Sequence, residues 1–164
     1  MKILVLSDSH AGMSFMRRCI DTLRPDVLIH LGDYFDDALS IREEYPQIPM
    51  HQVPGNCDRY RSPAWASEIL TETIGGVRFY MTHGHRHQVK MGTGALLRAA
   101  EQARADIVLY GHTHCPECYC EDGMWVMNPG SCGSYGGTAG LVTVDGGRIT
   151  ACRILKSSEM VGLG

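Results

Sequence analysis

The sequence predicts an α/β fold in which mixed β-sheets are covered by helices. Strand-like apolar runs alternate with helix-like segments in the first half of the chain, and the last third consists of β-hairpins. Metal-binding side chains stand where apolar runs end, which is where open α/β sheets hold their sites. The chain has 164 residues, enough for one domain with its own core, and we expect residues 1–164 to form a single domain.

Strands and helices alternate at the start of the chain. The runs KILVLS at 2–7 and DVLIHLGD at 26–33 are almost continuously apolar, as expected of strands buried on both faces. Helix-like segments follow at 13–23 and, less regularly, at 36–45. A short strand within 49–58 ends in a Pro-Gly turn.

β-Hairpins dominate the rest of the chain. Apolar and polar residues alternate on both sides of Gly75-Gly76, which predicts a hairpin over 67–85. A segment rich in Ala, Leu and Arg predicts a helix over 92–104, and an apolar run predicts a strand over 105–114 that ends in polar residues. Two further hairpins are expected, 117–121 with 124–128 and 140–145 with 148–154, and a Gly-rich loop at 130–140.

The composition argues against a dedicated nucleic-acid or membrane surface. The formal net charge is -3, whereas such proteins usually concentrate Lys and Arg. No apolar run approaches the roughly 20 residues that span a bilayer, and the apolar start at 3–6 is too short for a secretory signal. We therefore expect a cytoplasmic protein. The cysteine count of 7 is odd, which in that compartment favours reduced, metal-bound or buried thiols over a disulfide framework.

Five turns that follow apolar runs carry side chains able to bind a metal. Each turn alone is weak evidence, because Asp and Asn are ordinary turn residues and a lone His is more often structural. At one sheet edge, however, so many carboxylates and imidazoles would favour bound cations, and they are too many for one tetrahedral ion. Two ions sharing a carboxylate would use them well. The turns hold Asp8 and His10, Asp33, Asn56 to Asp58, His83 and His85, and His112 and His114.

The order of these turns, D-x-H, G-D, G-N-x-D, H-G-H and G-H-x-H, followed by NPGS at 128–131, resembles the calcineurin-like metallophosphoesterase superfamily and its small YfcE-like phosphodiesterase branch. The resemblance covers nearly the whole chain. It implies an α/β sandwich of two mixed β-sheets flanked by helices. It also implies a dinuclear centre, commonly of Mn, with Zn, Fe, Ni or Co as alternatives, that hydrolyses small phosphodiesters by attack of a metal-bridging hydroxide.

The resemblance also assigns roles to individual residues. Asn56 would stabilise charge on the phosphate oxygens, Asp58 would orient a neighbouring group, and His85 would lie close to the phosphate. Cys57 stands where many members carry the histidine thought to protonate the leaving group, and a thiol is a poorer acid than an imidazolium. The implied metal ligands are Asp8, His10 and His114 for the first ion, Asn56, His83 and His112 for the second, and Asp33 as the bridge between both.

Several alternatives remain open. Cys115, Cys118 and Cys120 could form a zinc knuckle with a neighbouring histidine, or Cys115 and Cys118 a redox pair, although a second C-x-x-C half-site is absent. A phosphomonoesterase and a non-catalytic interaction scaffold of the same fold are the functional alternatives. The partner we expect is a small phosphoester, with no nucleic acid and no membrane. Exposed hairpin edges could also pair in a homo-oligomer.

Overall fold

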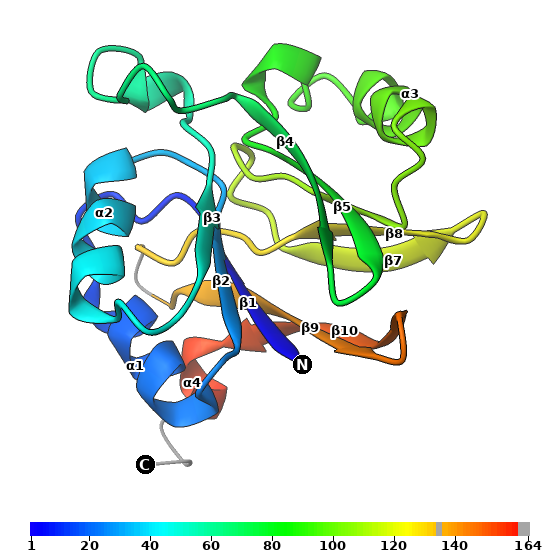
Figure 1. Cartoon of the computed structure of the whole chain (residues 1–164). Helices are drawn as coiled ribbons and strands as arrows, with labels where there is room; N and C mark the ends of the chain where they lie inside the picture. The colour runs from blue at the N-terminus through cyan, green and yellow to red at the C-terminus, as the bar shows by residue number, and fades with distance from the viewer. Residues whose placement is uncertain (134–135, 161–164) are drawn as a thin grey trace.

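Two five-stranded mixed sheets face each other in the structure, a computed structural model that describes residues 1–133 and 136–160 (Figure 1). This confirms the α/β sandwich. In the first sheet the order is β10-β9-β1-β2-β3, and β1, β2 and β3 run parallel while β9 and β10 form an antiparallel hairpin. Its strands are β1 (Lys2–Leu6), β2 (Val27–His30), β3 (Met50–Gln52), β9 (Thr138–Asp145) and β10 (Arg148–Lys156).

The second sheet has the order β4-β5-β6-β8-β7. Its centre is again parallel, through β5, β6 and β8, and antiparallel pairs close both sides. Because the parallel strands of each sheet end on one edge, the turns that follow them are brought together. The strands are β4 (Ile69–Ile74), β5 (Val77–Thr82), β6 (Ile107–Leu109), β7 (Glu117–Glu121) and β8 (Met124–Asn128).

The main core lies between the sheets, and β1 shows how the sequence builds it. Ile3 and Val5 point into the space between the sheets, whereas Leu4 and Leu6 point outward under the helices. All four side chains are completely buried, which explains why this strand is apolar at every position and not only at alternate ones.

Helices cover the outer face of each sheet (Figure 1). On α1, Phe15, Met16, Cys19 and Ile20 recur at helical spacing and pack on the first sheet. The helices are α1 (Ser14–Leu23), α2 (Phe35–Glu44) and α4 (Ser157–Met160) beside the first sheet, and α3 (Gly94–Gln102) on the second, with single 3-10 turns η1 (Asn56–Asp58) and η2 (His85–His87).

Each expected strand and helix is present, but several strands end earlier than the sequence suggests, two of them by five residues or more. The strand expected within 49–58 is confined to β3, and that expected over 105–114 is confined to β6. In both cases the polar residues at the end of the segment form one of the turns that carry candidate metal ligands. The Gly-rich loop expected at 130–140 gives way to β9 at Thr138, and its residues 134–135 lie outside the described part of the chain.

Among the residues that the structure describes, no helix has the length and apolar character needed to cross a bilayer.

Candidate metal centre

The side chains that the sequence singles out gather where strands of both sheets end. Each lies just after a strand, so its position is fixed by the sheet while its backbone is free to turn. Asp8 and His10 follow β1, Asp33 follows β2, Asn56 and Asp58 follow β3, His83 and His85 follow β5, and His112 and His114 follow β6.

The first group of potential ligands comprises Asp8, His10 and His114, whose ligand atoms all lie within 4.8 Å of one another. Oδ1 of Asp8 lies 3.0 Å from Nε2 of His114 and 3.9 Å from Nε2 of His10. The Nε2 atoms of the two imidazoles are 3.4 Å apart. Asp8 is buried while both histidines are partly exposed. One carboxylate and two imidazoles therefore face a common point within reach of solvent.

The second group comprises Asp33, His83 and His112, within the same 4.8 Å limit. Nε2 of His83 lies 3.4 Å from Oδ2 of Asp33 and 3.2 Å from Nδ1 of His112. Asn56 reaches the same nitrogen with its Oδ1 at 3.1 Å. The other ring nitrogen of His83 is hydrogen-bonded to the carbonyl oxygen of Leu31 at 2.8 Å, which fixes the ring with Nε2 toward the group.

The two groups are neighbours rather than separate sites. His83 is the contact between them, because its Nε2 lies 3.9 Å from Oδ1 of Asp8 as well as 3.4 Å from Oδ2 of Asp33. The structure thus brings all seven proposed ligands together. The assignment of Asp33 as a ligand shared by two ions stays a prediction.

Five of these residues adopt the left-handed backbone region that residues other than glycine rarely enter. The φ angles are 54° at Asp8, 44° at His10, 58° at Asp33, 70° at His112 and 60° at His114. Strained backbone of this kind persists only where the surroundings enforce it, and it clusters at functional sites. The left-handed backbone at these residues also explains why the strands end before them, because a strand needs an extended backbone.

Two glycines allow the ligand turns to pack against one another. A Cβ on Gly55 would overlap the carboxylate of Asp33. On Gly111 it would overlap Oγ of Ser7 and lie 2.8 Å from Oδ2 of Asp8. Any side chain at either position would push a candidate ligand out of place.

Asp58 holds the Asp33 turn from behind. Its carboxylate accepts hydrogen bonds from the backbone N–H groups of Asp33 at 2.9 Å, Phe35 at 2.8 Å and Gly55 at 2.8 Å. The side chain is buried and takes no part in either ligand group. Its hydrogen bonds hold the turns of Asp33 and Gly55, and the orienting role that the family resemblance implies stays a prediction.

Polar residues to which the sequence analysis gave no individual role support the turns as well. Oγ of Ser7 donates to Oδ2 of Asp8 at 2.6 Å, and Oγ of Ser131 donates to the carbonyl of Asp8 at 2.8 Å. Nδ2 of Asn128 donates to Oγ1 of Thr113 at 2.9 Å, and thus holds the turn that carries His112 and His114. The NPGS motif contains both Asn128 and Ser131, so this motif could have indicated their supporting roles from the sequence.

The protonation states of two candidate ligands favour metal binding. Burial alone would raise the pKa of Asp33, but hydrogen bonding to His83, the charge of His83 and the backbone N–H of Cys57 hold that pKa well below its usual range. Burial and the neighbouring charge of His83 lower the pKa of His112 to about 4. An ionised carboxylate and a neutral imidazole are the forms that coordinate a cation.

The donors fit a pair of divalent cations. Imidazole nitrogens approach one another to 3.2 Å and 3.4 Å with carboxylate oxygens beside them, so that lone pairs and negative charge converge on the same small region. Mixed nitrogen and oxygen donors suit Mn, Fe or Zn, whereas thiolate-rich sets suit structural zinc or iron–sulfur clusters.

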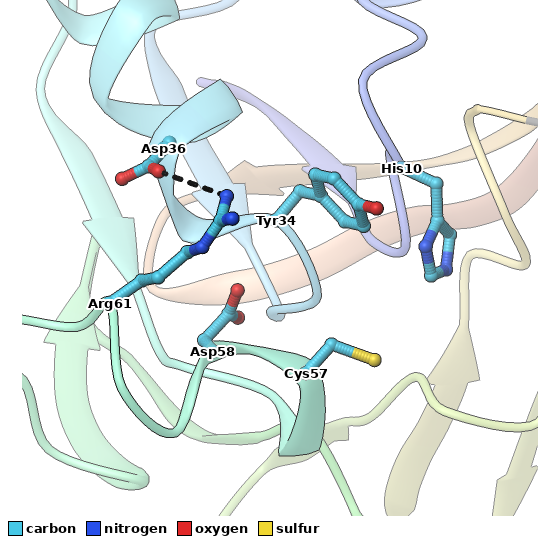
Figure 2. Close-up of a pocket in the computed structure, with 6 residues that line it drawn as sticks. All are labelled: His10, Tyr34, Asp36, Cys57, Asp58 and Arg61. Carbon is cyan, nitrogen blue, oxygen red and sulfur yellow. Dashed lines mark ion pairs between the residues drawn. The ribbon is translucent and has the colours of Figure 1, made fainter.

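Cys57 lines a hollow of about 220 Å³ beside the first group. In Figure 2 its thiol lies near the ring of His10 and faces the open space below the ring of Tyr34. Arg61 lies on the far side, 3.8 Å from the carboxylate of Asp36 in a solvent-exposed ion pair (Figure 2). No sequence motif pointed to Tyr34 or Arg61.

His85 lies on the other side of the centre. Its ring centroid is 5.5 Å from that of His83 and 6.2 Å from that of His112. Nε2 of His85 is also 3.6 Å from the carboxylate of Glu68. It is thus placed beside the ligand groups without belonging to either, which leaves room for contact with a substrate.

The cysteines after His114 form no metal site within residues 1–133 and 136–160. The two three-ligand groups found there contain no cysteine. Cys115 and Cys120 are exposed, and Cys118 lies on β7 with its sulfur against Cys152 of β10. The described residues therefore hold no three-ligand group that a zinc knuckle would need, and the sulfur of Cys118 contacts Cys152.

Known proteins are similar to this chain in sequence and in fold. A probable metallophosphoesterase of Mycoplasma pneumoniae is 32% identical over 133 residues, a match covering 79% of this chain and 78% of the relative. A phosphodiesterase of Methanocaldococcus jannaschii is 29% identical over 151 residues, covering 82% and 86%. The crystal structure of wild-type Vps29 from Entamoeba histolytica complexed with Zn²⁺ has the same fold, with a TM-score of 0.69 at 21% identity, covering 95% and 99%.

The family model of the calcineurin-like phosphoesterase superfamily domain matches residues 1–147, which include every candidate ligand. The chain therefore belongs to the calcineurin-like phosphoesterase superfamily.

Proposed function

We propose that the protein is a phosphodiesterase that hydrolyses small phosphodiesters with two divalent metal ions. The observation that carries the proposal is the contact between two three-ligand groups at one edge of the sandwich, joined through His83. Two metals about 3.5–4 Å apart are the arrangement that serves in-line displacement at phosphorus. One isolated group would serve a single ion.

The residues that would hold the ions follow from the two groups. Mn is the ion we expect, and Zn, Fe, Ni and Co suit the same donors. When bound, the ions would acidify a water and neutralise charge on the phosphate. Asp8, His10 and His114 would hold the first ion, Asn56, His83 and His112 the second, and Asp33 both.

Other residues of the chain would act on the substrate directly. The amide of Asn56 and the ring of His85 would contact phosphate oxygens, where hydrogen-bond donors stabilise developing charge. Cys57, which lines the hollow beside the first group, would face the leaving group. A thiol is a weaker acid than an imidazolium, so we expect esters with good leaving groups to react fastest.

Two hollows flank the ligand groups, and they favour a diester over a monoester. One, of about 220 Å³, is lined by His10 and Cys57 and contains Arg61. The other, of about 280 Å³, is lined by Asn56 and His85 and contains Arg59 and Arg86. A phosphodiester carries an organic group on each side of the phosphorus, whereas a monoester carries only one and would fill a single hollow.

The test compares bis(4-nitrophenyl) phosphate with 4-nitrophenyl phosphate, using metal-depleted protein with and without added Mn²⁺. We expect Mn²⁺ to restore turnover of the diester and to favour it over the monoester. Asp33→Asn should abolish the Mn²⁺-dependent rate, while the exposed Asp145→Asn serves as a matched control that keeps it.

Two other outcomes would support the phosphomonoesterase or the non-catalytic scaffold instead. Faster turnover of the monoester would assign a phosphomonoesterase. Binding of two ions without turnover of either ester would contradict the enzyme and favour an interaction scaffold of this fold.

A further inference from the structure

Two half-buried cysteines from different sheets touch each other and belong to neither ligand group. The sulfur atoms of Cys118 and Cys152 lie 3.0 Å apart, and both residues are free thiols. Cys118 belongs to β7, the edge strand of the second sheet, and Cys152 belongs to β10, the edge strand of the first (Figure 1). The contact therefore joins the edge strand of one sheet to the edge strand of the other.

The surroundings hold both side chains in this position. Each packs against the apolar core between the sheets. The strands fix the backbone through the antiparallel registers of Cys118 with Met127 and of Cys152 with Val142. A disulfide needs sulfur atoms about 2.05 Å apart. Closing the remaining distance of about 1 Å thus requires only small side-chain rotations.

We propose that Cys118 and Cys152 are a modification site at which a low-molecular-weight disulfide, such as oxidised glutathione, introduces a cross-link between the two sheets. This proposal is independent of the metal centre and of the phosphodiesterase activity.

The reaction is a thiol–disulfide exchange in two steps. The thiolate of Cys118 attacks one sulfur of the reagent, forms a mixed disulfide and releases the first thiolate. The sulfur of Cys152 then loses its proton and attacks the Cys118 sulfur, so that the protein disulfide forms and the second thiolate leaves. The two protein thiols are oxidised and the reagent is reduced to two thiols, which take up the two protons.

The order of these steps follows from the thiol contact. Hydrogen bonding between the two sulfurs lowers the pKa of Cys118. It also combines with burial to raise the pKa of Cys152. The thiolate is the attacking species, so Cys118 reacts first. Cys152 is already in contact and resolves the mixed disulfide.

The cross-link would stabilise the fold by restricting the unfolded chain. The two cysteines are 34 residues apart in sequence. For a loop of that length and a protein of this size, we expect the melting temperature to rise by about 10 °C.

The test incubates the full-length, metal-loaded protein in buffers with increasing ratios of oxidised to reduced glutathione. Remaining thiols are then alkylated, and the protein is digested and mapped by mass spectrometry. We expect a Cys118–Cys152 cross-linked peptide, while the exposed Cys57, Cys115 and Cys120 carry glutathione or the alkyl label. Pairing of Cys118 with Cys115 or Cys120, or labelling of both Cys118 and Cys152 when the exposed thiols are oxidised, would overturn the proposal.

Melting curves of matched variants supply a second readout. Cys120→Ser changes an exposed thiol on the same strand and should keep the rise in melting temperature on oxidation. Cys118→Ser and Cys152→Ser should each abolish it. A rise of the same size in either of these two variants would assign the stabilisation to another site and contradict the proposal.

Discussion

Asp58 shows how a buried carboxylate beside the candidate metal centre can hold ligand turns without being a ligand itself. Its two oxygens accept three backbone N–H groups, and two of these belong to the turns of Asp33 and of Gly55, which precedes Asn56. The sequence identifies Asp58 through its motif. It cannot reveal the partners at Asp33 and Phe35, because these lie in a turn after a different strand.

Replacing Asp58 with Asn should destabilise the protein by about 3 kcal/mol, because the amide nitrogen cannot accept the hydrogen bonds that one carboxylate oxygen now accepts. The matched control Asp36→Asn changes a side chain that is 57% exposed, and it should shift the free energy of unfolding by less than about 0.5 kcal/mol. Urea unfolding of metal-depleted protein measures both. Equal shifts for the two variants would contradict the orienting role.

Gly111 permits a close approach that no other residue allows. Gly111→Ala would displace the carboxylate of Asp8, and we expect turnover of the diester to fall roughly 100-fold, as displacements of about 1 Å do in active sites. Gly94→Ala in α3 meets only the end of the flexible Arg98 side chain and should leave the rate unchanged. A wild-type rate in the Gly111→Ala variant would show that the turn can accommodate a methyl group without displacing Asp8, and would contradict this account.

At the scale of single elements, β2 carries a buried histidine that binds no metal in our assignment. His30 accepts a hydrogen bond from the N–H of Gly32 at 3.2 Å and contacts Oγ of Ser9 at 3.1 Å. Burial lowers its pKa to about 4, with smaller and opposing effects from Asp58 and His83, and weaker ones from Asp33 and His10. The strand therefore carries a neutral imidazole at neutral pH.

This histidine should make the stability of the protein depend on pH. Below about pH 6.5 the unfolded chain gains a proton at His30 that the folded chain does not bind, so stability falls as the pH drops. Between about pH 7.5 and pH 5 the loss from this group is on the order of 2 kcal/mol. In the variant His30→Asn, Oδ1 can still accept the hydrogen bond from Gly32. Its free energy of unfolding should therefore fall by about 2 kcal/mol less than that of the wild type between about pH 7.5 and pH 5. Urea unfolding of metal-depleted protein at a series of pH values measures the difference. Parallel pH profiles would contradict the assignment.

Strands and helices were predictable from the sequence wherever a repeated pattern defines them. The apolar run of β1 and the helical spacing of α1 are such patterns. The strand ends were less predictable, because the polar residues that follow β6, such as His112 and His114, could equally have continued the strand. What ends that strand is the left-handed backbone of the ligand turn, and this depends on packing against Asp8 from the other sheet.

At the scale of the whole molecule, each ligand group draws residues from both sheets. Asp8 and Asp33 follow strands of the first sheet, and His83, His112 and His114 follow strands of the second. This convergence explains why the candidate site was predictable as a set, since sheet topology brings strand ends together. Tyr34 and Arg61 were not predictable, because their place in the hollow depends on the path of loops.

Bound ions should therefore hold the two sheets together and stabilise the fold. At a metal concentration about 100-fold above the dissociation constant, we expect the melting temperature to rise by roughly 5 to 10 °C for each ion. Adding a chelator should reverse the rise. Asp33→Asn should lose most of it and Asp145→Asn none, and a rise of equal size in Asp33→Asn would contradict the account.

The most direct test of the central claim is anomalous diffraction from a crystal of the protein grown with Mn²⁺. Our account predicts two anomalous peaks about 3.5–4 Å apart, one among Asp8, His10 and His114 and the other among Asn56, His83 and His112, with Asp33 touching both. A single peak, or a second peak at Cys115, Cys118 or Cys120, would contradict the dinuclear centre.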